Sequence, residues 1–234
     1  MTMSTRTVRL FLKPLVFAAS LAPLVLDAWT VVRRFPDPHP YRLLVTDTGV
    51  WTLWFICFTL VLTPVRRLTS WHWLAMFRRM LGLFAFFYAT LHTLIYIGYY
   101  RIAELDPAVG LVSIAAVAEL TSSTARDIIS KPFLAIGLAA LVVMVPLAAT
   151  STSGMIRRLG GRSWRRLHRL VYAAAILSLL HHWWPLADRF RIDTYALLIV
   201  LSLAARVAWA VHSRLPRMPG SARSPVETPR ATPI

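Results

Sequence analysis

The chain has 234 residues, of which 57% are hydrophobic and 15% charged, and its mean hydropathy is +0.58. This composition excludes a soluble globular domain, because a chain of this length could not bury so much apolar surface. The net charge of +16 would suggest a nucleic-acid-binding protein, but the basic residues lie between apolar segments and favour a membrane protein. The single cysteine, Cys57, excludes an intrachain disulfide and a cysteine-based metal motif.

Six apolar segments are long enough to cross a bilayer as helices, which takes about 17 to 25 residues. The first follows Arg6 and Arg9 and has no small-residue cleavage site after it, so we expect a retained helix rather than a signal peptide. A seventh stretch, Ala108–Ala118, is too short to cross and is expected to lie on the membrane surface or to re-enter it. The predicted fold class is all-α, a six-helix transmembrane bundle. Its segments are Leu10–Val32, Thr48–Pro64, Met80–Tyr100, Phe133–Ala149, Leu170–Leu186 and Tyr195–Val211.

Basic and acidic residues lie in alternate connections between these segments. Arginines are concentrated in the N-terminus, in residues 65–79 and 157–169, and in the C-terminal tail, whereas nine of the ten acidic residues lie on the opposite side. Under the positive-inside rule, this asymmetry places both termini in the cytoplasm.

The chain is expected to divide into three parts. Residues 1–9 form a cytoplasmic N-terminus, residues 10–211 the transmembrane domain, and residues 212–234, rich in Pro, Ser and Arg, a disordered cytoplasmic tail. The sequence has no glycine-rich phosphate-binding fingerprint, and the tail is too short for a nucleotide-binding domain. An electron-transfer function would therefore need an electron donor on another molecule.

Histidines within the apolar segments indicate a functional site, because an imidazole in hydrocarbon is costly. His92 lies twelve residues beyond Met80, which is about 18 Å along a helix, and His181 and His182 lie about 20 Å beyond His168. Both segments run outward, so the imidazoles of His92 and of His181 or His182 fall at similar depth. Two imidazoles at one depth on separate helices can hold one metal between them.

A haem explains these histidines with the fewest ligands. A zinc site needs four ligands, and no third is evident at this depth, while a proton relay needs carboxylates that the later spans lack. A haem needs axial ligands and an apolar slot. The aromatic residues expected to line that slot are Phe84, Phe87, Tyr88, Tyr96, Trp183 and Trp184. The alternative is that the histidines only pack helices together, or that His168 is an interfacial residue.

Helical geometry leaves the choice between His181 and His182 open. At 100° per residue, His182 lies within about 40° of the face of His168, whereas His181 is about 140° away. A bend before Pro185, or haems on different sides of the helix, would permit His181.

Three stretches resemble a known family. They are RRMLGLFAFFYATLH (Arg78–His92), KPFLAIG (Lys131–Gly137) and TSTSGMIRRLGGRSWRRLHRLVYAAAILSLLHHWW (Thr150–Trp184), and LTPVRR (Leu62–Arg67) matches a further segment. They are similar to the MsrQ family, the haem-binding membrane subunits of bacterial periplasmic methionine-sulfoxide reductase systems. These subunits are members of the ferric reductase-like transmembrane family. The resemblance covers roughly residues 48–211.

The resemblance implies a haem b electron-transfer subunit of the bacterial inner membrane, rather than the catalytic subunit. Its implied haem ligands are His92, His168 and His181, with His182 as the fallback. It also implies electrons from the quinone pool and a periplasmic MsrP-type molybdopterin enzyme that reduces methionine sulfoxide in proteins.

The resemblance also implies FMN as a second cofactor, with its phosphate among the arginines of residues 157–169. Those expected to hold it are Arg157, Arg158, Arg162, Arg165 and Arg166, although the positive-inside rule alone accounts for such a cluster. Arg101 is expected near haem propionates at the outer edge.

One departure from the wider ferric reductase-like family leaves the number of haems at one or two. Its members typically have a second histidine on the third helix, where this chain has Arg78 and Arg79. Other functions remain open from the sequence. One is a ferric or other metal reductase core, or another cytochrome b-type quinol-linked subunit. The non-redox alternative is a transporter or assembly protein whose histidines only pack.

Overall fold

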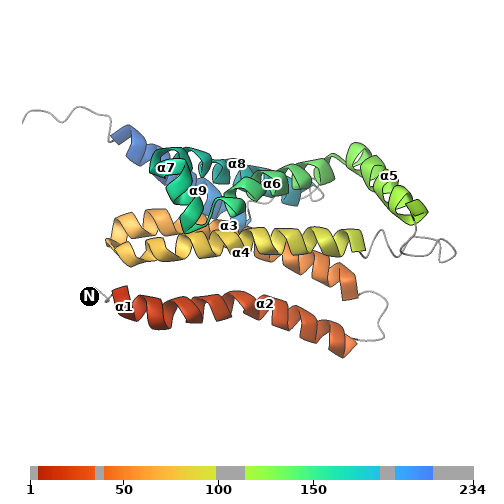
Figure 1. Cartoon of the computed structure of the whole chain (residues 1–234), viewed down its shortest axis with the longest axis horizontal. Helices are drawn as coiled ribbons and strands as arrows, with labels where there is room; N and C mark the ends of the chain where they lie inside the picture. Colours follow the sequence, from red (N-terminus) through yellow and green to blue (C-terminus); the bar gives the residue numbers. More distant parts are fainter. Residues whose placement is uncertain (1–4, 35–39, 99–113, 185–192, 213–234) are drawn as a thin grey trace, which may run out of the picture.

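The computed structural model describes residues 5–34, 40–98, 114–184 and 193–212, and every element in these ranges is a helix (Figure 1). The predicted all-helical fold class is therefore confirmed for this part of the chain. In chain order the helices are α1 (Thr5–Thr7), η1 (Val8–Leu12), α2 (Lys13–Arg34), α3 (Pro40–Thr69), η2 (His72–Leu74), α4 (Ala75–Tyr96), α5 (Ile114–Ser130), α6 (Pro132–Ala149), α7 (Ser153–Leu167), α8 (Leu170–Trp183) and α9 (Thr194–His212).

Five segments within the described ranges are long and apolar enough to cross a membrane. They are Val8–Arg34, Leu43–Thr69, His72–Tyr96, Pro132–Ala149 and Thr194–His212. The sixth predicted span corresponds to α8, which is apolar but has 14 residues, and the rest of that prediction lies beyond Trp184, outside the described residues. The chain is thus a multi-pass membrane protein, and a sixth crossing stays a prediction.

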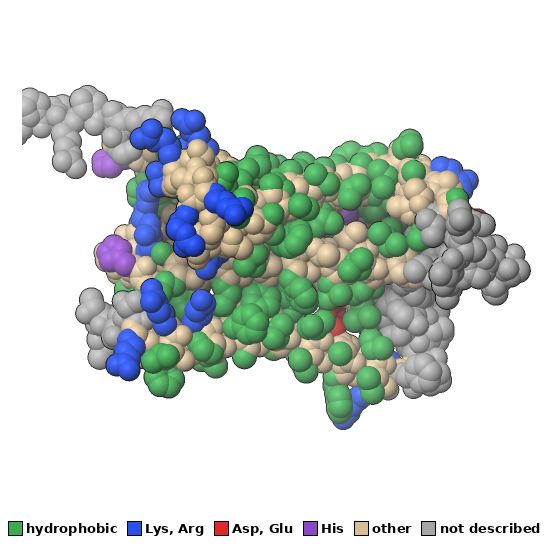
Figure 2. Space-filling model, viewed as in Figure 1, with side chains coloured by type: hydrophobic (Ala, Val, Ile, Leu, Met, Phe, Trp, Pro, Cys, Tyr) green, Lys and Arg blue, Asp and Glu red, His purple; other side chains and the backbone are tan. Residues whose placement is uncertain are grey.

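The long helices run alternately along the bundle. The start of α1 and the end of α9 lie at one end of it, together with α7, while α5 lies at the other (Figure 1). Lysine and arginine side chains gather at the first of these ends, which we call the basic end, and green apolar side chains cover the middle of the visible face (Figure 2). The two described chain ends therefore lie at the same end of the bundle. That this end is cytoplasmic stays a prediction of the positive-inside rule.

The buried core is formed mainly by α3, α4, α8 and α9, and Tyr88 of α4 connects it to α2. The Tyr88 ring stacks on Phe55 at 5.3 Å. Its hydroxyl donates to the carbonyl of Ser20 at 2.9 Å and accepts from the amide of Leu24 at 3.3 Å. Tyr88 thus occupies the gap in the main-chain ladder of α2 beside Pro23, where the helix is weakened.

Two further helices lie between the spans. The first residues of α5 overlap the stretch that was predicted to lie on or re-enter the membrane, and residues 108–113 of that stretch lie outside the described residues. Helix α7 carries much of the predicted arginine cluster and contains Gly160, whose φ of 73° introduces a kink. Thr152 caps this helix by accepting from the amide of Met155 at 3.2 Å.

Candidate functional site

His92 on α4 and His181 on α8 face each other across the bundle. Their ring centroids lie 6.0 Å apart, with the ring planes at 82°. His92 Nδ1 is 2.8 Å from the carbonyl oxygen of Val45 on α3, and His181 Nδ1 is 2.7 Å from that of Phe133 on α6. A carbonyl oxygen can only accept, so Nδ1 carries the proton in both rings, and Nε2 is the nitrogen left to bind a metal.

This geometry fits two axial ligands of one iron. A metal–imidazole bond is about 2 Å long, so two imidazoles on opposite sides of a metal have ring centres about 6 Å apart. A hydrogen bond from the second ring nitrogen to a main-chain carbonyl is the usual way in which a ligating histidine is oriented. Two opposed imidazoles suit a ligand that brings most of its own coordination, such as haem.

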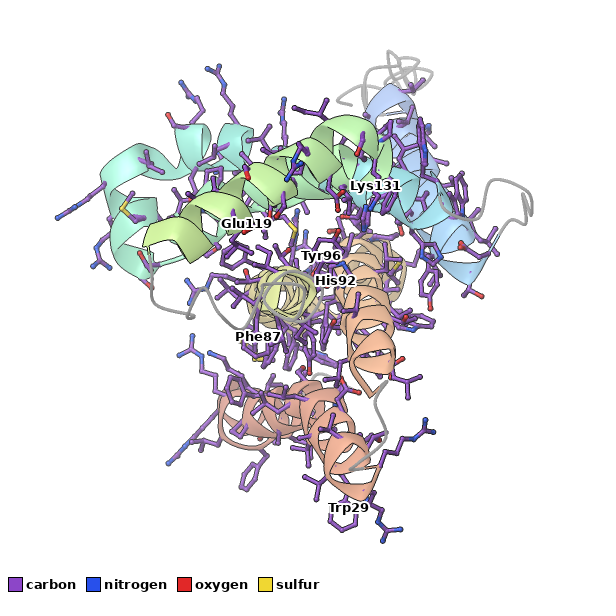
Figure 3. All side chains as sticks on the ribbon, turned by 90° about the vertical axis from the view of Figure 1, so that its right-hand side faces the viewer. Trp29, Phe87, His92, Tyr96, Glu119 and Lys131 are labelled. Atoms are coloured by element: carbon purple, nitrogen blue, oxygen red, sulfur yellow. The ribbon has the colours of Figure 1, made fainter. Side chains whose placement is uncertain are left out.

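The two imidazoles line a cavity of about 410 Å³, called the outer cavity here. Its walls come from α3, α4, α5, α6 and α8. Figure 3 shows His92 and Tyr96 pointing away from α2, whereas Phe87 points toward it. Tyr96 donates a hydrogen bond to the carboxylate of Asp127 at 3.3 Å, and Lys131 pairs with the same oxygen at 3.2 Å.

The aromatic residues predicted to form the slot are mostly elsewhere, and that prediction was wrong. Only Tyr96 of the six lines the outer cavity. Phe84 packs on Phe17 of α2, and the Tyr88 hydroxyl donates to the carbonyl of Ser20 of α2, because that face of α4 covers α2. The cavity wall is instead built largely from aliphatic side chains, together with Phe133 and five small residues that leave room for a planar group. These small residues are Gly49, Ala89, Gly137, Ala140 and Ser178. Arg101 lies outside the described residues.

His182 points to a different neighbour from His181. Its Nε2 donates to a carboxylate oxygen of Asp193 at 3.1 Å, and the same oxygen accepts from Trp183 Nε1 at 3.1 Å. The other oxygen of Asp193 caps α9 by accepting from the amide of Ala196 at 2.9 Å. The structure therefore places His181, not His182, opposite His92.

Among the described residues, no second imidazole faces His168. It ends α7 in the turn before α8, and its ring stacks on Trp164 with centroids 3.9 Å apart. Thr150 donates its hydroxyl proton to the carbonyl of Pro146 at 2.6 Å, so it accepts from His168 Nε2 at 3.2 Å. Burial and, secondarily, the nearby Arg78 guanidinium lower the pKa of His168, which favours its neutral form.

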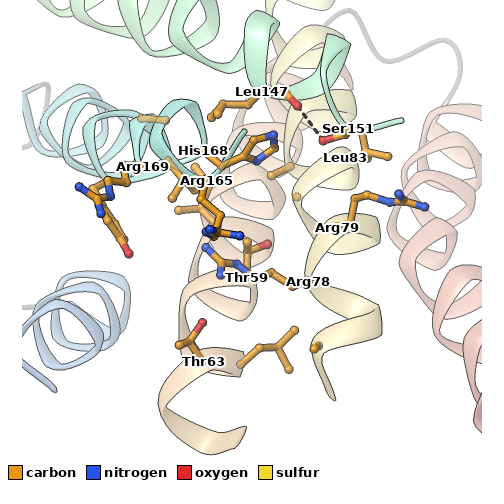
Figure 4. A pocket seen from close by; sticks show the side chains of 18 of the residues that line it. Thr59, Thr63, Arg78, Arg79, Leu83, Leu147, Ser151, Arg165, His168 and Arg169 are labelled. Carbon is orange, nitrogen blue, oxygen red and sulfur yellow. Dashed lines mark hydrogen bonds between the residues drawn. The ribbon is translucent and has the colours of Figure 1, made fainter. Parts of the chain in front are cut away.

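A second cavity of about 880 Å³, called the inner cavity here, opens at the basic end beside His168 (Figure 4). Among the described residues that line it, seven are arginines and none is acidic. These arginines are Arg66, Arg67, Arg78, Arg79, Arg165, Arg169 and Arg206. A cavity with this lining favours an anionic ligand.

Only Arg165 of the five arginines predicted to hold a phosphate lines the inner cavity. The others lie on α7 outside it. The other six arginines of the inner cavity come from α3, α4 and α9 and, for Arg169, from the turn before α8. The sequence did not predict that these residues lie together. Met144 on α6 lines both cavities, so its side chain lies in the wall between them.

Residues 48–179 match the family model described as the ferric reductase like transmembrane component. The chain is 37% identical over 206 residues to the protein-methionine-sulfoxide reductase heme-binding subunit MsrQ of Herminiimonas arsenicoxydans, covering 87% of each chain. It is 46% identical over 174 residues to the MsrQ of Ralstonia nicotianae, covering 73% of each chain, and 40% identical over 200 residues to that of Rhodospirillum rubrum, covering 85% of this chain and 88% of the relative.

Proposed function

The chain belongs to the ferric reductase-like transmembrane family and, within it, to the MsrQ haem-binding subunits, and on this premise we propose that it carries electrons through a haem b held by His92 and His181. The observation that carries this proposal is the opposed pair of imidazoles, each oriented by a main-chain carbonyl through Nδ1. A haem bound there supplies a one-electron carrier, whose potential depends on its axial ligands and burial.

The residues around the pair orient the ligands and limit the access of water. Val45 and Phe133 hold the two rings through their carbonyls, and the walls from α3, α4 and α6 surround them. Thr124 and Asp127 of α5 line the outer cavity as well, at the end of the bundle away from the basic end. A mostly apolar setting would strengthen the influence of each imidazole on a bound haem iron.

The depth of the histidine pair supports an acceptor outside the cytoplasm. His92 lies four residues before the end of α4 and His181 two residues before the end of α8, so both are within about 6 Å of the outer helix ends. We place the basic end on the cytoplasmic side of a bacterial inner membrane, so the outer helix ends near the two histidines face the periplasm. The proposed acceptor is an MsrP-type molybdopterin methionine-sulfoxide reductase, and the proposed electron source is the quinone pool.

The inner cavity supports FMN as a second cofactor. Guanidinium groups bind phosphate through paired, charge-assisted hydrogen bonds, and the seven arginines around this cavity are suited to a phosphate group. The inner cavity supports a second haem less well, because His168 Nε2 donates to Thr150 and no second imidazole lines this cavity among the described residues.

A pyridine haemochrome assay on the purified chain tests this function. The expected result is about one haem b per chain, reducible by quinol, for the wild type and for His168→Ala alike. A haem content near two that falls to one in His168→Ala would instead place a haem at the inner cavity. Purified protein with no haem at all would contradict the proposal and favour a membrane protein whose histidines only pack.

A further inference from the structure

Each of the two facing imidazoles lies against a glycine of the neighbouring helix. His92 bonds to the carbonyl of Val45 and packs on Gly49, four residues further along α3. His181 bonds to the carbonyl of Phe133 and packs on Gly137, four residues further along α6. The same arrangement of carbonyl, glycine and imidazole thus occurs twice, on two different pairs of helices.

A side chain would collide with the imidazole at Gly137 and would crowd it at Gly49. A Cβ at Gly49 would lie 3.1 Å from His92 Nδ1 and 3.2 Å from its Cε1. A Cβ at Gly137 would lie 2.6 Å from His181 Nδ1 and 2.8 Å from its Cε1, which is closer than non-bonded carbon atoms tolerate. The ring edge that carries the hydrogen bond therefore occupies the space of the missing side chain.

Helix geometry explains why the glycine follows its carbonyl by four residues. In an α-helix the Cα–Cβ bond tilts toward the N-terminus, so a side chain covers the turn before it, including the carbonyl four residues back. A glycine at that position opens the carbonyl to an outside donor. Glycine weakens a helix interior, so its presence here indicates a specific need.

Other described glycines lack a close contact with an imidazole, although a Cβ at Gly161 would lie 3.2 Å from the flexible end of the Arg165 side chain. A Cβ at Gly82, on α4, would be 3.8 Å from the nearest atom of Thr59, which is an ordinary distance. A Cβ at Gly98 or Gly154 would meet nothing within 4 Å. Close contact with an imidazole is therefore a property of Gly49 and Gly137 and not of the described glycines in general.

We propose that Gly49 and Gly137 are positioning residues for the two axial imidazoles. Gly49 lets the edge of the His92 ring reach the carbonyl of Val45, and Gly137 lets the edge of the His181 ring reach the carbonyl of Phe133. The resulting hydrogen bond fixes the proton on Nδ1 and directs Nε2 toward the iron. This inference rests on the proposed haem function and assigns these four residues a role in it. It also predicts an order of effects, because the space at Gly137 is tighter than that at Gly49.

The test compares Gly137→Ala and Gly49→Ala with Gly98→Ala, two residues beyond the end of α4, as the control. Haem per chain, the optical and electron paramagnetic resonance spectra of the oxidised protein, and the reduction potential are measured. We expect Gly137→Ala to lower haem affinity about 10- to 100-fold, the usual effect of losing a residue that orients a metal ligand. Its remaining haem is expected to be high-spin, and added imidazole should restore the low-spin spectrum. Gly49→Ala is expected to change the spectrum and potential less, and Gly98→Ala not at all.

A wild-type spectrum and potential in Gly137→Ala would overturn the inference while leaving the proposed function intact. Loss of haem from Gly137→Ala without recovery in imidazole, in a chain that still folds, would also overturn it, because it would indicate a packing role only. If Gly137→Ala does not fold, Gly49→Ala decides, and an unchanged spectrum and potential there overturns the inference. A wild type without haem would overturn the proposed function itself.

Discussion

The two adjacent histidines of α8 have different hydrogen-bonding partners, and this difference separates their roles. His181 Nδ1 bonds to a main-chain carbonyl and its ring faces His92, whereas His182 Nε2 bonds to Asp193. Counting helical turns from His168 favours His182, but the structure shows why that count fails. His168 and Arg169 form a turn between α7 and α8, so the angular step does not run through one continuous helix. Only resemblance to the family pointed to His181.

Substitution of each histidine by alanine tests this separation. We expect His181→Ala to lose most of the bound haem, because one axial ligand is removed. His182→Ala is expected to keep it, since that change removes a wall residue of the outer cavity and the link to Asp193 but neither of the two facing imidazoles. Haem content relative to protein is the measurement, with thermal stability recorded for both. Equal loss of haem from the two variants would be inconsistent with the geometry.

The arginines of the inner cavity offer a second test at this scale. Arg78 lines the cavity, whereas Arg162 is exposed on α7 and does not. Arg78→Gln should weaken FMN binding about tenfold, as expected for one lost charge-assisted hydrogen bond. Arg162→Gln should leave it unchanged. Flavin fluorescence after denaturation of the purified variants measures the retained FMN, and equal effects of the two changes would argue against the inner cavity as the flavin site.

At the scale of elements, the link between α2 and α4 depends on the hydroxyl of Tyr88. This group bridges the Ser20 carbonyl and the Leu24 amide beside Pro23. Tyr88→Phe would keep the stacking on Phe55 but leave two main-chain groups of α2 without this partner, at a cost of about 1 to 3 kcal/mol. We expect a lower unfolding temperature and faster amide exchange in α2, with haem content unchanged. A variant as stable as the wild type would show that the bridge contributes little.

The sequence predicted the long elements well and the lining of the cavities poorly. Apolar length alone located five spans, because a helix in lipid must be apolar along its whole length. The aromatic slot was wrong, since composition does not reveal which face of α4 covers α2 and which faces α6. Arg206 and Arg66 reach one cavity from α9 and α3, which lie far apart in the chain. Such convergence depends on helix packing, which no local pattern in the sequence encodes.

At the scale of the whole molecule, the basic end fixes the expected orientation in the membrane. Ser153 is exposed on α7 at that end, and Ser122 is exposed on α5 at the other. The single native cysteine, Cys57, is fully buried and should not react. A membrane-impermeant maleimide added to intact spheroplasts should label Ser122→Cys and leave Ser153→Cys unlabelled until the cells are opened. Labelling of the Ser153→Cys variant in intact spheroplasts would reverse the topology and put the histidine pair near the cytoplasm.

The central claim is that one haem is held between α4 and α8 by His92 and His181. Near-infrared magnetic circular dichroism of the oxidised, purified chain identifies an axial ligand pair directly. We expect the band of a low-spin haem with two histidine ligands in the wild type, and its loss in both His92→Ala and His181→Ala. A different ligand pair in the wild type, or a bis-histidine band that survives either substitution, would contradict the claim.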